Sequence, residues 1–581
     1  MAERFSTPGI YREELDLSEI TIPVGTSTGA IVIDSNVGPI NRRVRVTNDK
    51  EFIAIFGEPD GSTFGHYAAL EFLKESSGLY VVRSSQGEGE LYSNMCIGTT
   101  AVVEGTSAVD EVLTSAAILS AGSSTDSIAG SYSDGDKTNN IKTIENVSYP
   151  GDTFLCIASI GPGTYGNNIG IRLTTCADTP AVSGGYFDWK SKYDDDPTTA
   201  IDPLFAKVFK IDVFTKESTA STFSDTSTPI ESFYVTRTEE VDGNGRQLQA
   251  EKIINGSSKY IYVKNTNTQD IGKLPVSIQT ITSLSAGTNS STSMSEGNTQ
   301  SAWNLFEDRN RSTVNILMFP NEPTSSTVKA TQSYVGNIAA DRQDCIAVVQ
   351  ANSYAYQSIS DLITSTNNAY NNGSYVAMYG GYSQIYDKYN DKTIMIPNAI
   401  YGASIMARTD SVANTWDAPA GINRGIVNAY DQDRVLTDTE IGLLYDANIN
   451  CIKKIEGIGY IMWGQATAQL KSSALDRINV RRLLLYVENT IEPSLLPFLF
   501  EANSSQNRLR VRTITEDFLS SVQSGGGLTK FQVVCDTTNN TPAVIDSNQM
   551  YVDIYVQPAR TIEFIKLKTI ITKTGVDFSE V

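Results

Sequence analysis

Histidine is nearly absent from this sequence of 581 residues, where His66 is the single example. Catalytic triads, HExxH zinc sites and histidine-based acid–base pairs draw on this side chain, so a histidine-rich metalloenzyme is excluded. The six cysteines lie far apart and form no CxxC pair, which argues against a zinc knuckle or a disulfide scaffold. We therefore expect reduced cysteines in the core, and neither a metal nor a cofactor.

Long apolar runs are missing as well. No stretch approaches the roughly 18–20 residues that cross a bilayer, and the opening MAERFSTPGIYREEL has no apolar signal region. We therefore expect no direct membrane insertion and a cytosol-like compartment. Positive charge is also scarce, because 45 Lys and Arg stand against 66 Asp and Glu, and the net charge of −21 disfavours nucleic acid as a partner.

Two stretches of the chain show the alternation of strands and helices that is typical of an α/β fold. In the first, apolar runs at 29–35 and 79–83 predict strands with two helices between them. In the second, runs at 312–320 and 344–350 predict strands separated by amphipathic helices. Thr437 and Glu440 have capping-box spacing, and a hairpin is expected near Glu456-Gly457. This pattern predicts a mostly parallel sheet covered by helices.

The middle of the chain, residues 91–300, has a different texture. Short Thr/Val/Tyr-rich runs alternate with turn residues, Asp242-Gly243 predicts a hairpin, and 14 basic side chains stand against 24 acidic ones. The polar stretch 283–300 is interpreted as a linker that builds no core. Because the α/β pattern stops near residue 90 and resumes near 300, we expect one core with β-rich domains inserted into it.

Three motifs could indicate a nucleotide site, a cation site or a nucleophile, and each of them also has a purely structural interpretation. The GPGTYG loop at 161–166 matches GxGxxG, but a strand-like run follows it where a dinucleotide site needs a helix, so a β-turn is favoured. The acidic groups at Asp134/Asp136 and 194–196 could bind a cation or be solvated loops, since they lack EF-hand spacing. Cys345 and Cys535 are interpreted as buried thiols rather than nucleophiles.

Residues 451–581 differ from the rest in charge, since they carry 14 basic and 13 acidic side chains. Six arginines gather there, three in a predicted helix and three in a predicted strand. They form either a solvated face or a docking face for an acidic protein surface. They are Arg477, Arg481, Arg482, Arg508, Arg510 and Arg512.

Several segments of the chain resemble the motifs of one known family. The opening TPGIYREELDLS and the following IPVGTSTGAIVIDSNVGPIN are similar to its N-terminal arm, strand and turn. GPGTYGNNIGIRL resembles its PGTWGN segment, with Tyr165 in place of tryptophan. IMIPNAIYGASIMARTDSVANTWDAPAG resembles its most characteristic block, although Ala403-Ser404 stands where Ala-Gly is usual. LYDANINCIKKIEGIGYIMWGQAT and INVRRLLLYVENTI resemble the segments that follow. The family that these segments resemble is the contractile phage tail sheath family.

The resemblance implies a structural subunit and no enzyme. Such subunits stack as six-fold rings around a tail tube, in a helical assembly that contracts to drive the tube through a cell envelope. The expected partners are further copies of the chain, the tube protein, and baseplate and tail terminator proteins. The expected location is the virion tail sheath, assembled in the host cytoplasm. A secretion-system or bacteriocin sheath and a nucleotide-binding α/β enzyme are the alternatives.

Combining pattern and resemblance, we expect five segments: an N-terminal arm at 1–25, a first core part at 26–90, inserted β-rich outer domains at 91–300, a second core part at 301–545, and a C-terminal strand and arm at 546–581. The two arms have opposite charge and are too short to bury their own apolar side chains, so we expect strand exchange between subunits. The six arginines are candidates to face the tube. The arm positions are Pro8, Gly9, Ile10, Tyr11, Leu15, Ile562, Phe564, Ile565, Leu567, Ile570 and Ile571.

Overall fold

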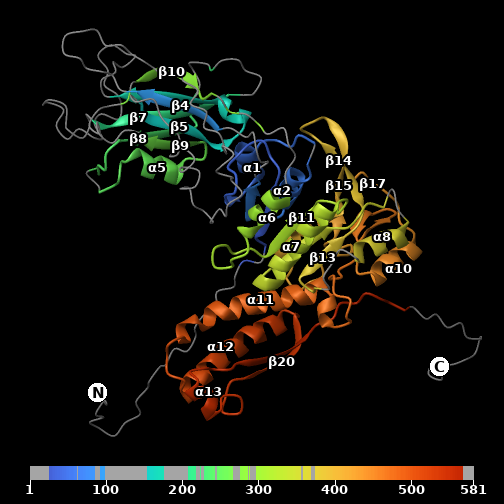
Figure 1. The fold of residues 1–581 in the computed structure, drawn as a ribbon. Helices are drawn as coiled ribbons and strands as arrows, with labels where there is room; N and C mark the ends of the chain where they lie inside the picture. Colours follow the sequence, from blue (N-terminus) through green and yellow to red (C-terminus); the bar gives the residue numbers. More distant parts are fainter. Residues whose placement is uncertain are drawn as a thin grey trace, which may run out of the picture.

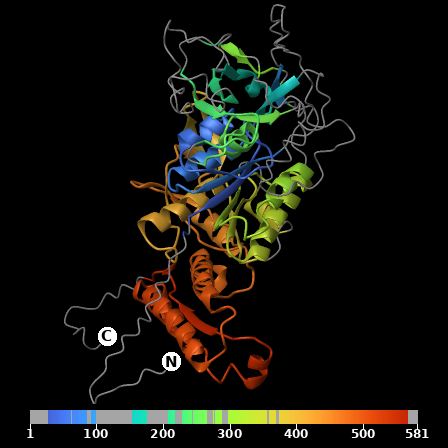
Figure 2. The ribbon, with the colours of Figure 1, turned by 90° about the vertical axis from the view of Figure 1, so that its left-hand side faces the viewer.

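A computed structural model gives the fold of this chain. It describes residues 25, 27–61, 63–84, 92–98, 153–175, 207–216, 223, 228–242, 245–265, 275, 277–285, 287, 289, 296–354, 358–367 and 373–566. These residues form three tiers along one long axis: a β-rich unit, a central α/β unit, and a C-terminal unit of helices and a small sheet (Figure 1, Figure 2). Among them, no helix has the length and apolar character to cross a membrane.

The central tier is built on a six-stranded sheet. All neighbouring strands pair in parallel except β2, which is antiparallel to β3. Strands from two distant parts of the sequence share this sheet, because β1 lies between β11 and β3. The order is β13 (Val376–Tyr379), β12 (Ile346–Gln350), β11 (Ile316–Phe319), β1 (Gly29–Ile33), β3 (Leu79–Arg83) and β2 (Val44–Val46).

Helices cover both faces of the central sheet, as the unbroken apolar runs of its strands predict. Successive side chains of a strand point to opposite faces, so Ile31 and Val81 enter one core while Ala30 and Val82 enter the other. The first core is closed by α2 and α9, the second by α6, α7 and α8. The helices are α1 (Asp49–Phe56), α2 (Gly65–Leu73), α6 (Glu296–Asn304), α7 (Ser326–Arg342), α8 (Ile359–Asn367), α9 (Asn398–Val412) and α10 (Asp438–Asp446).

Two of the local predictions are confirmed in this tier. Helix α10 begins with a capping box in which the Thr437 side chain accepts from the Glu440 backbone and the Glu440 carboxylate accepts from the Thr437 backbone. The hairpin expected near Glu456-Gly457 is also present, with Gly457 at φ 81. Two small antiparallel sheets complete the tier: β15 (Lys392–Pro397), β14 (Tyr382–Asp387) and β17 (Asp431–Gln432), and β16 (Ile426–Val427), β19 (Gly459–Met462) and β18 (Ile452–Ile455).

The β-rich tier consists of two antiparallel sheets that share one core. A helix that the sequence did not predict, α5 (Ala250–Ser257), packs on β9. The prediction of a linker at 283–300 is wrong for its last residues, because α6 starts at Glu296. This helix brings Trp303 into the core, where its side chain is fully buried. The strands are β4 (Tyr92–Gly98), β5 (Thr153–Pro162), β9 (Ile261–Asn265), β10 (Ile278–Ser283), β6 (Ile169–Thr175), β7 (Phe209–Thr215) and β8 (Glu231–Val235).

The C-terminal tier contains α11 (Ile478–Leu495), α12 (Ser505–Ser524), β20 (Leu528–Val534), α13 (Pro542–Asp546) and β21 (Asp553–Pro558). The strand expected at 508–512 is wrong, because these residues belong to α12. The Ser504 side chain caps this helix by accepting from the Asn507 backbone, and Val511 and Phe518 lie one helical repeat apart on its buried face. Taken together, the three tiers confirm the mixed α/β class.

Candidate functional site

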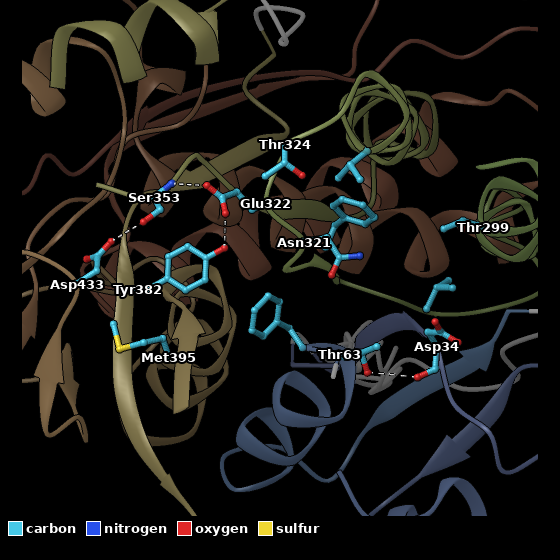
Figure 3. A pocket seen from close by; sticks show the side chains of 15 residues that line it. Asp34, Thr63, Thr299, Asn321, Glu322, Thr324, Ser353, Tyr382, Met395 and Asp433 are labelled. Atoms are coloured by element: carbon cyan, nitrogen blue, oxygen red, sulfur yellow. Dashed lines mark hydrogen bonds between the residues drawn. The ribbon is translucent and has the colours of Figure 1, made fainter. Parts of the chain in front are cut away.

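A pocket of about 620 Å³ lies at the carboxyl edge of the central sheet. It lies beyond the ends of β1 and β11, between the first helices of the chain and the β14–β15 hairpin (Figure 3). Ligands of open α/β sheets bind in this kind of position. Its chemistry therefore tests whether the fold holds a nucleotide site.

Hydrogen bonds among the pocket residues join loops that are distant in sequence (Figure 3). The Glu322 carboxylate accepts from the Ser353 backbone at 2.7 Å and from the Tyr382 hydroxyl at 3.0 Å. The Asp433 carboxylate accepts from the Ser353 hydroxyl at 3.0 Å and the Tyr354 backbone at 3.1 Å. Burial raises the pKa of Asp433, and burial next to Glu322 raises the pKa of Tyr382. The carboxylates thus hold the pocket wall together.

The charge of the pocket disfavours phosphate. Asp34, Glu322 and Asp433 line it, whereas none of the described residues around it is a lysine, arginine or histidine. A nucleotide would bring more negative charge to three carboxylates without a compensating cation. Nowhere in the described ranges do three His, Cys, Asp or Glu side chains gather as a metal would require.

The GPGTYG loop has a structural role at the junction of two tiers. It leads from β5 through a short 3-10 turn, Thr164–Asn168, into β6, so no α-helix opens on it. A Cβ on Gly161 would lie 2.0 Å from the carbonyl oxygen of Gly38 in the central tier. The buried Arg83 side chain donates to the carbonyls of Gly38 at 2.8 Å and Pro162 at 2.9 Å. The glycine thus permits close backbone contact between the tiers.

The candidate nucleophiles are buried thiols. Cys345 and Cys535 are almost fully buried, and burial raises the pKa of both. Burial also raises the pKa of Cys451 to about 12. His66 packs against Phe52, and its Nε2 donates to the Phe56 carbonyl oxygen at 3.3 Å, so this imidazole is held in the core away from the thiols. The acidic groups at 134–136 and 194–196 lie outside the described residues.

Three of the six arginines are buried within their own chain, so they cannot face a tube in this conformation. The Arg482 guanidinium donates to the Asp410 carboxylate at 2.5 Å, and both side chains are at most 5% exposed. Arg481 donates to Ser374 and stacks 4.1 Å over the ring of Tyr375. Arg508 donates to Asn503 near the start of α12. The sequence pattern did not reveal these partners, which come from other elements.

The other three arginines lie at or near the surface. Arg512 pairs with Glu516 one helical turn later at 2.8 Å, and Arg510 is half-buried. Arg477 donates to Glu563 at 2.8 Å through Nε and contacts Tyr445. Of the six arginines, only Arg477, Arg510 and Arg512 therefore remain candidates to face a tube.

The C-terminal segment that follows β21 is extended but unpaired. The strand expected from Ile562 is absent from the described part, residues 559–566, because no neighbouring strand offers backbone partners. Glu563 holds the segment to α11 through Arg477, while Ile562, Phe564 and Ile565 are 79–85% exposed. Leu567, Ile570 and Ile571, and the arm positions Pro8, Gly9, Ile10, Tyr11 and Leu15, lie outside the described residues.

Exposed apolar side chains also gather at the turn between α11 and α12, which the sequence analysis missed. Leu496, Leu499 and Leu509 are 57–62% exposed, and Phe500 is fully exposed. Phe500 has φ 70, in the left-handed region that an aromatic residue rarely adopts. The apolar run SLLPFLF was the available signal, but a run of this kind is ordinarily a core segment.

The second half of the chain is similar to two domains of a known family. Residues 297–468 match the phage tail sheath protein central domain, and residues 471–572 match the phage tail sheath C-terminal domain. The tail sheath protein of Enterobacteria phage T4 is 34% identical over 342 residues, which is 56% of this chain and 51% of that protein. The tail sheath protein of Vibrio phage KVP40 is 35% identical over 44% of this chain and 41% of its own length. This chain thus spans about half the length of the curated relatives it matches.

Solved structures share the fold at low sequence identity. The contracted-state sheath of an extracellular contractile injection system, PVC, aligns over 100% of both chains with a TM-score of 0.50 and 14% identity. The sheath tail protein from Listeria innocua aligns over 93% of this chain and 97% of its own with a TM-score of 0.52 and 11% identity. The domain matches and the phage relatives confirm the sheath resemblance seen in the sequence, and the solved structures show that the fold is shared.

Proposed function

We propose that this chain, which carries the central and C-terminal domains of the phage tail sheath family, is the sheath subunit of a contractile phage tail. The observation that supports this most is the pair of adjacent domain matches, in the family's order, over residues 297–468 and 471–572. In the proposed assembly, copies stack as six-fold rings around a tail tube, between a baseplate and a terminator. The location is the virion, after assembly in the host cytoplasm.

The proposed function needs no catalysis, and the chemistry of the chain supports this. The pocket at the carboxyl edge is acidic, and the described thiols are buried. The work of contraction would come from burial of surface between subunits. At about 25 cal/mol per Å², an additional ~200 Å² per subunit corresponds to about 5 kcal/mol before conformational costs.

The domain division belongs to the same proposal. Residues 26–90 and 301–545 supply the two parts of the sheath core, as the central tier and most of the C-terminal tier, and 91–300 form an outer unit that adds little to the lattice. In support, β1 and β3 lie beside β11 in one sheet, whereas β4 to β10 form two separate sheets (Figure 1). The negative charge of 91–300 also favours a solvent-facing position.

The arms at 1–25 and after Glu563 link subunits by strand exchange. The two-stranded sheet β20–β21 supports this, since no third described strand pairs with either of its edges. Free edges offer backbone donors and acceptors that an arm of another copy can satisfy. Because Glu563 is held to its own chain, the exchanged C-terminal strand begins after this residue, at about Ile565 to Ile571. A tube-facing role is left for Arg477, Arg510 and Arg512.

Negative-stain microscopy of the purified chain tests the proposal, and we expect tubular polymers. Variants that lack residues 1–20 or end at Pro558 should remain folded by circular dichroism but form no tubes. Nucleotide titration by calorimetry should give no binding heat. Persistent monomers of the full chain at high concentration would contradict the proposal.

A sheath of a secretion system or bacteriocin is the second candidate, favoured by the fold match to an injection-system sheath. The higher identity to phage tail sheath proteins, 34–35%, favours a phage instead. Heads attached to sheathed tails in particles from producing cells would distinguish the two.

A further inference from the structure

A protruding apolar group lies at the turn between α11 and α12. We call Leu496, Leu499, Phe500 and Leu509 the knob. Its side chains are 57–107% exposed, which is unusual for one contiguous group of large apolar residues. The backbone of Phe500 is in the left-handed region at φ 70, a strained conformation for a residue with a Cβ. Strain that directs an aromatic ring into solvent indicates a binding role rather than a packing role.

A concave surface lies at the other end of α11. This pocket, which we call the socket, has a volume of about 690 Å³. Its apolar lining includes Tyr445, Val480, Ile562 and Phe564, and the rest of its lining is mostly polar or charged. Its wall is fixed in place, because Glu563 accepts from Arg477 at 2.8 Å and from Gln465 at 3.0 Å. The Phe564 ring meets the Tyr445 ring edge to face at 5.7 Å. The socket is thus preformed, with aromatic walls that suit an aromatic side chain.

Of the four charged residues that line the socket, Arg477 pairs with Asp476 and Glu563, which leaves Arg560 as the basic group that can meet an acidic partner. Glu501 directly follows Phe500 and is exposed, and Arg560 is exposed at the socket. Within the described part of the chain, neither side chain takes part in an ion pair. An acidic group beside the inserted ring would therefore meet a basic group beside its receptor.

The positions of the two surfaces determine what kind of contact they can make. They lie at opposite ends of α11, which has 18 residues and so a length of about 27 Å. One chain cannot bring its own knob to its own socket. Two different surfaces of one subunit that bind each other make a head-to-tail contact, which repeats from copy to copy and builds rings or helices.

We propose that the knob of one copy docks in the socket of the next copy, with Glu501 paired to Arg560. This inference rests on the proposed function, since both require self-assembly. It adds a contact between folded surfaces to the linkage by arms, and it assigns the exposed apolar residues of the C-terminal tier to a second copy of this chain.

The first test removes the ring without unfolding the subunit. Phe500→Gly suits the left-handed backbone, so its melting temperature should be unchanged or higher. Self-association of the full chain, measured by sedimentation velocity over a concentration series, should weaken about tenfold or more. Val412→Ala is the control, because Val412 is 65% exposed but lies outside the knob, and it should associate normally. Normal association of Phe500→Gly would overturn the inference.

The second test exchanges the charges. Glu501→Arg and Arg560→Glu should each weaken association several-fold, and the double variant should recover most of the loss. Single variants that associate normally would overturn the pairing. So would a double variant whose loss of association equals the two single losses multiplied together, because the two charges would then act independently. Knob variants that form normal tubes but no longer hold a tube protein would also overturn it and assign the knob to the tube. If the unmodified chain does not associate at all, the proposed function fails as well.

Discussion

The central tier buries its apolar side chains on both faces of the sheet, whereas the C-terminal tier leaves many of them in solvent. Phe72 and Trp303 in the central tier are fully buried, while Phe500 and Phe564 in the C-terminal tier are 107% and 79% exposed. The sheets of the two tiers also differ. The central sheet has six strands, whereas the sheet of the C-terminal tier has only β20 and β21, and no third described strand pairs with them. The two-stranded sheet is stabilised by α12, since Leu528 and Val533 share a core with Phe518 of this helix.

This difference separates two physical tasks. Burial within the chain stabilises the central tier, so its residues determine whether the subunit folds. Exposed apolar groups and open strand edges gain free energy only when another chain covers them. Substitutions of buried residues in the central tier should therefore lower the stability of the subunit. Substitutions of exposed apolar residues in the C-terminal tier should leave stability unchanged and weaken assembly.

The largest effect on unfolding is expected for Phe72→Ala. This ring is fully buried between α2 and β1, where it packs over Gly29, so its removal should cost about 3–5 kcal/mol. The matched variant Phe564→Ala should change stability by less than about 0.5 kcal/mol. Urea denaturation followed by fluorescence measures both. If both variants lost the same free energy of unfolding, the proposed difference between the tiers would be wrong.

Asp410→Ala should have the next largest effect, because Asp410 joins the two tiers. It pairs with Arg482 of α11 at 2.5 Å, and its removal leaves a buried guanidinium without a counter-charge, at a cost of about 3 kcal/mol. Asp410→Ala combined with Arg482→Met removes both charges and should recover part of the loss. Thermal denaturation of the three proteins tests this, and a double variant less stable than the single one would contradict it.

A smaller and pH-dependent effect is expected at Glu563. Burial raises the pKa of Glu563, but hydrogen bonds from Arg477, Tyr445 and Gln465 outweigh burial and lower it below its usual value. A lowered pKa in the folded state means that the stabilising contribution is present at neutral pH and is lost as pH falls through that pKa. The protection of residues 559–566 against hydrogen exchange, measured relative to the intrinsic rate at each pH, should therefore fall on acidification.

In the Glu563→Gln variant, residues 559–566 should have the lower protection at every pH. The neutral amide loses about 1 kcal/mol of charge-assisted hydrogen bonding. Glu516→Gln serves as the matched control. A segment whose exchange in the unmodified chain has no acid dependence beyond the intrinsic rate would show that Glu563 does not hold it.

The smallest effect is expected for the Arg512–Glu516 pair on the surface of α12. Both side chains are at least 36% exposed, and exposed pairs of this kind are screened by solvent and salt. Arg512→Ala should leave the unfolding midpoint unchanged within error. If Arg512 faces a tube, the same variant should weaken tube binding in a salt-dependent manner, measured by co-sedimentation.

Much of the local structure could be predicted from the sequence because its signals are local. The capping box at Thr437, the turn at Gly457 and the apolar runs of β1, β3, β11 and β12 each depend on neighbours within a few residues. These signals predicted the α/β class. The family resemblance depended on motifs that are also contiguous.

The sequence by itself therefore determined the elements of the core, the scarcity of catalytic groups and the likeness to sheath proteins. Only the tertiary structure decided which polar and apolar side chains are covered. Arg481 and Arg482 are buried because Tyr375 and Asp410, some 70–110 positions away, come to lie beside them. The arginines at 508–512 alternate like a strand, yet the core under α12 favours a helix. Burial depends on partners that are distant along the chain, so no local pattern could distinguish a buried arginine from a solvated one.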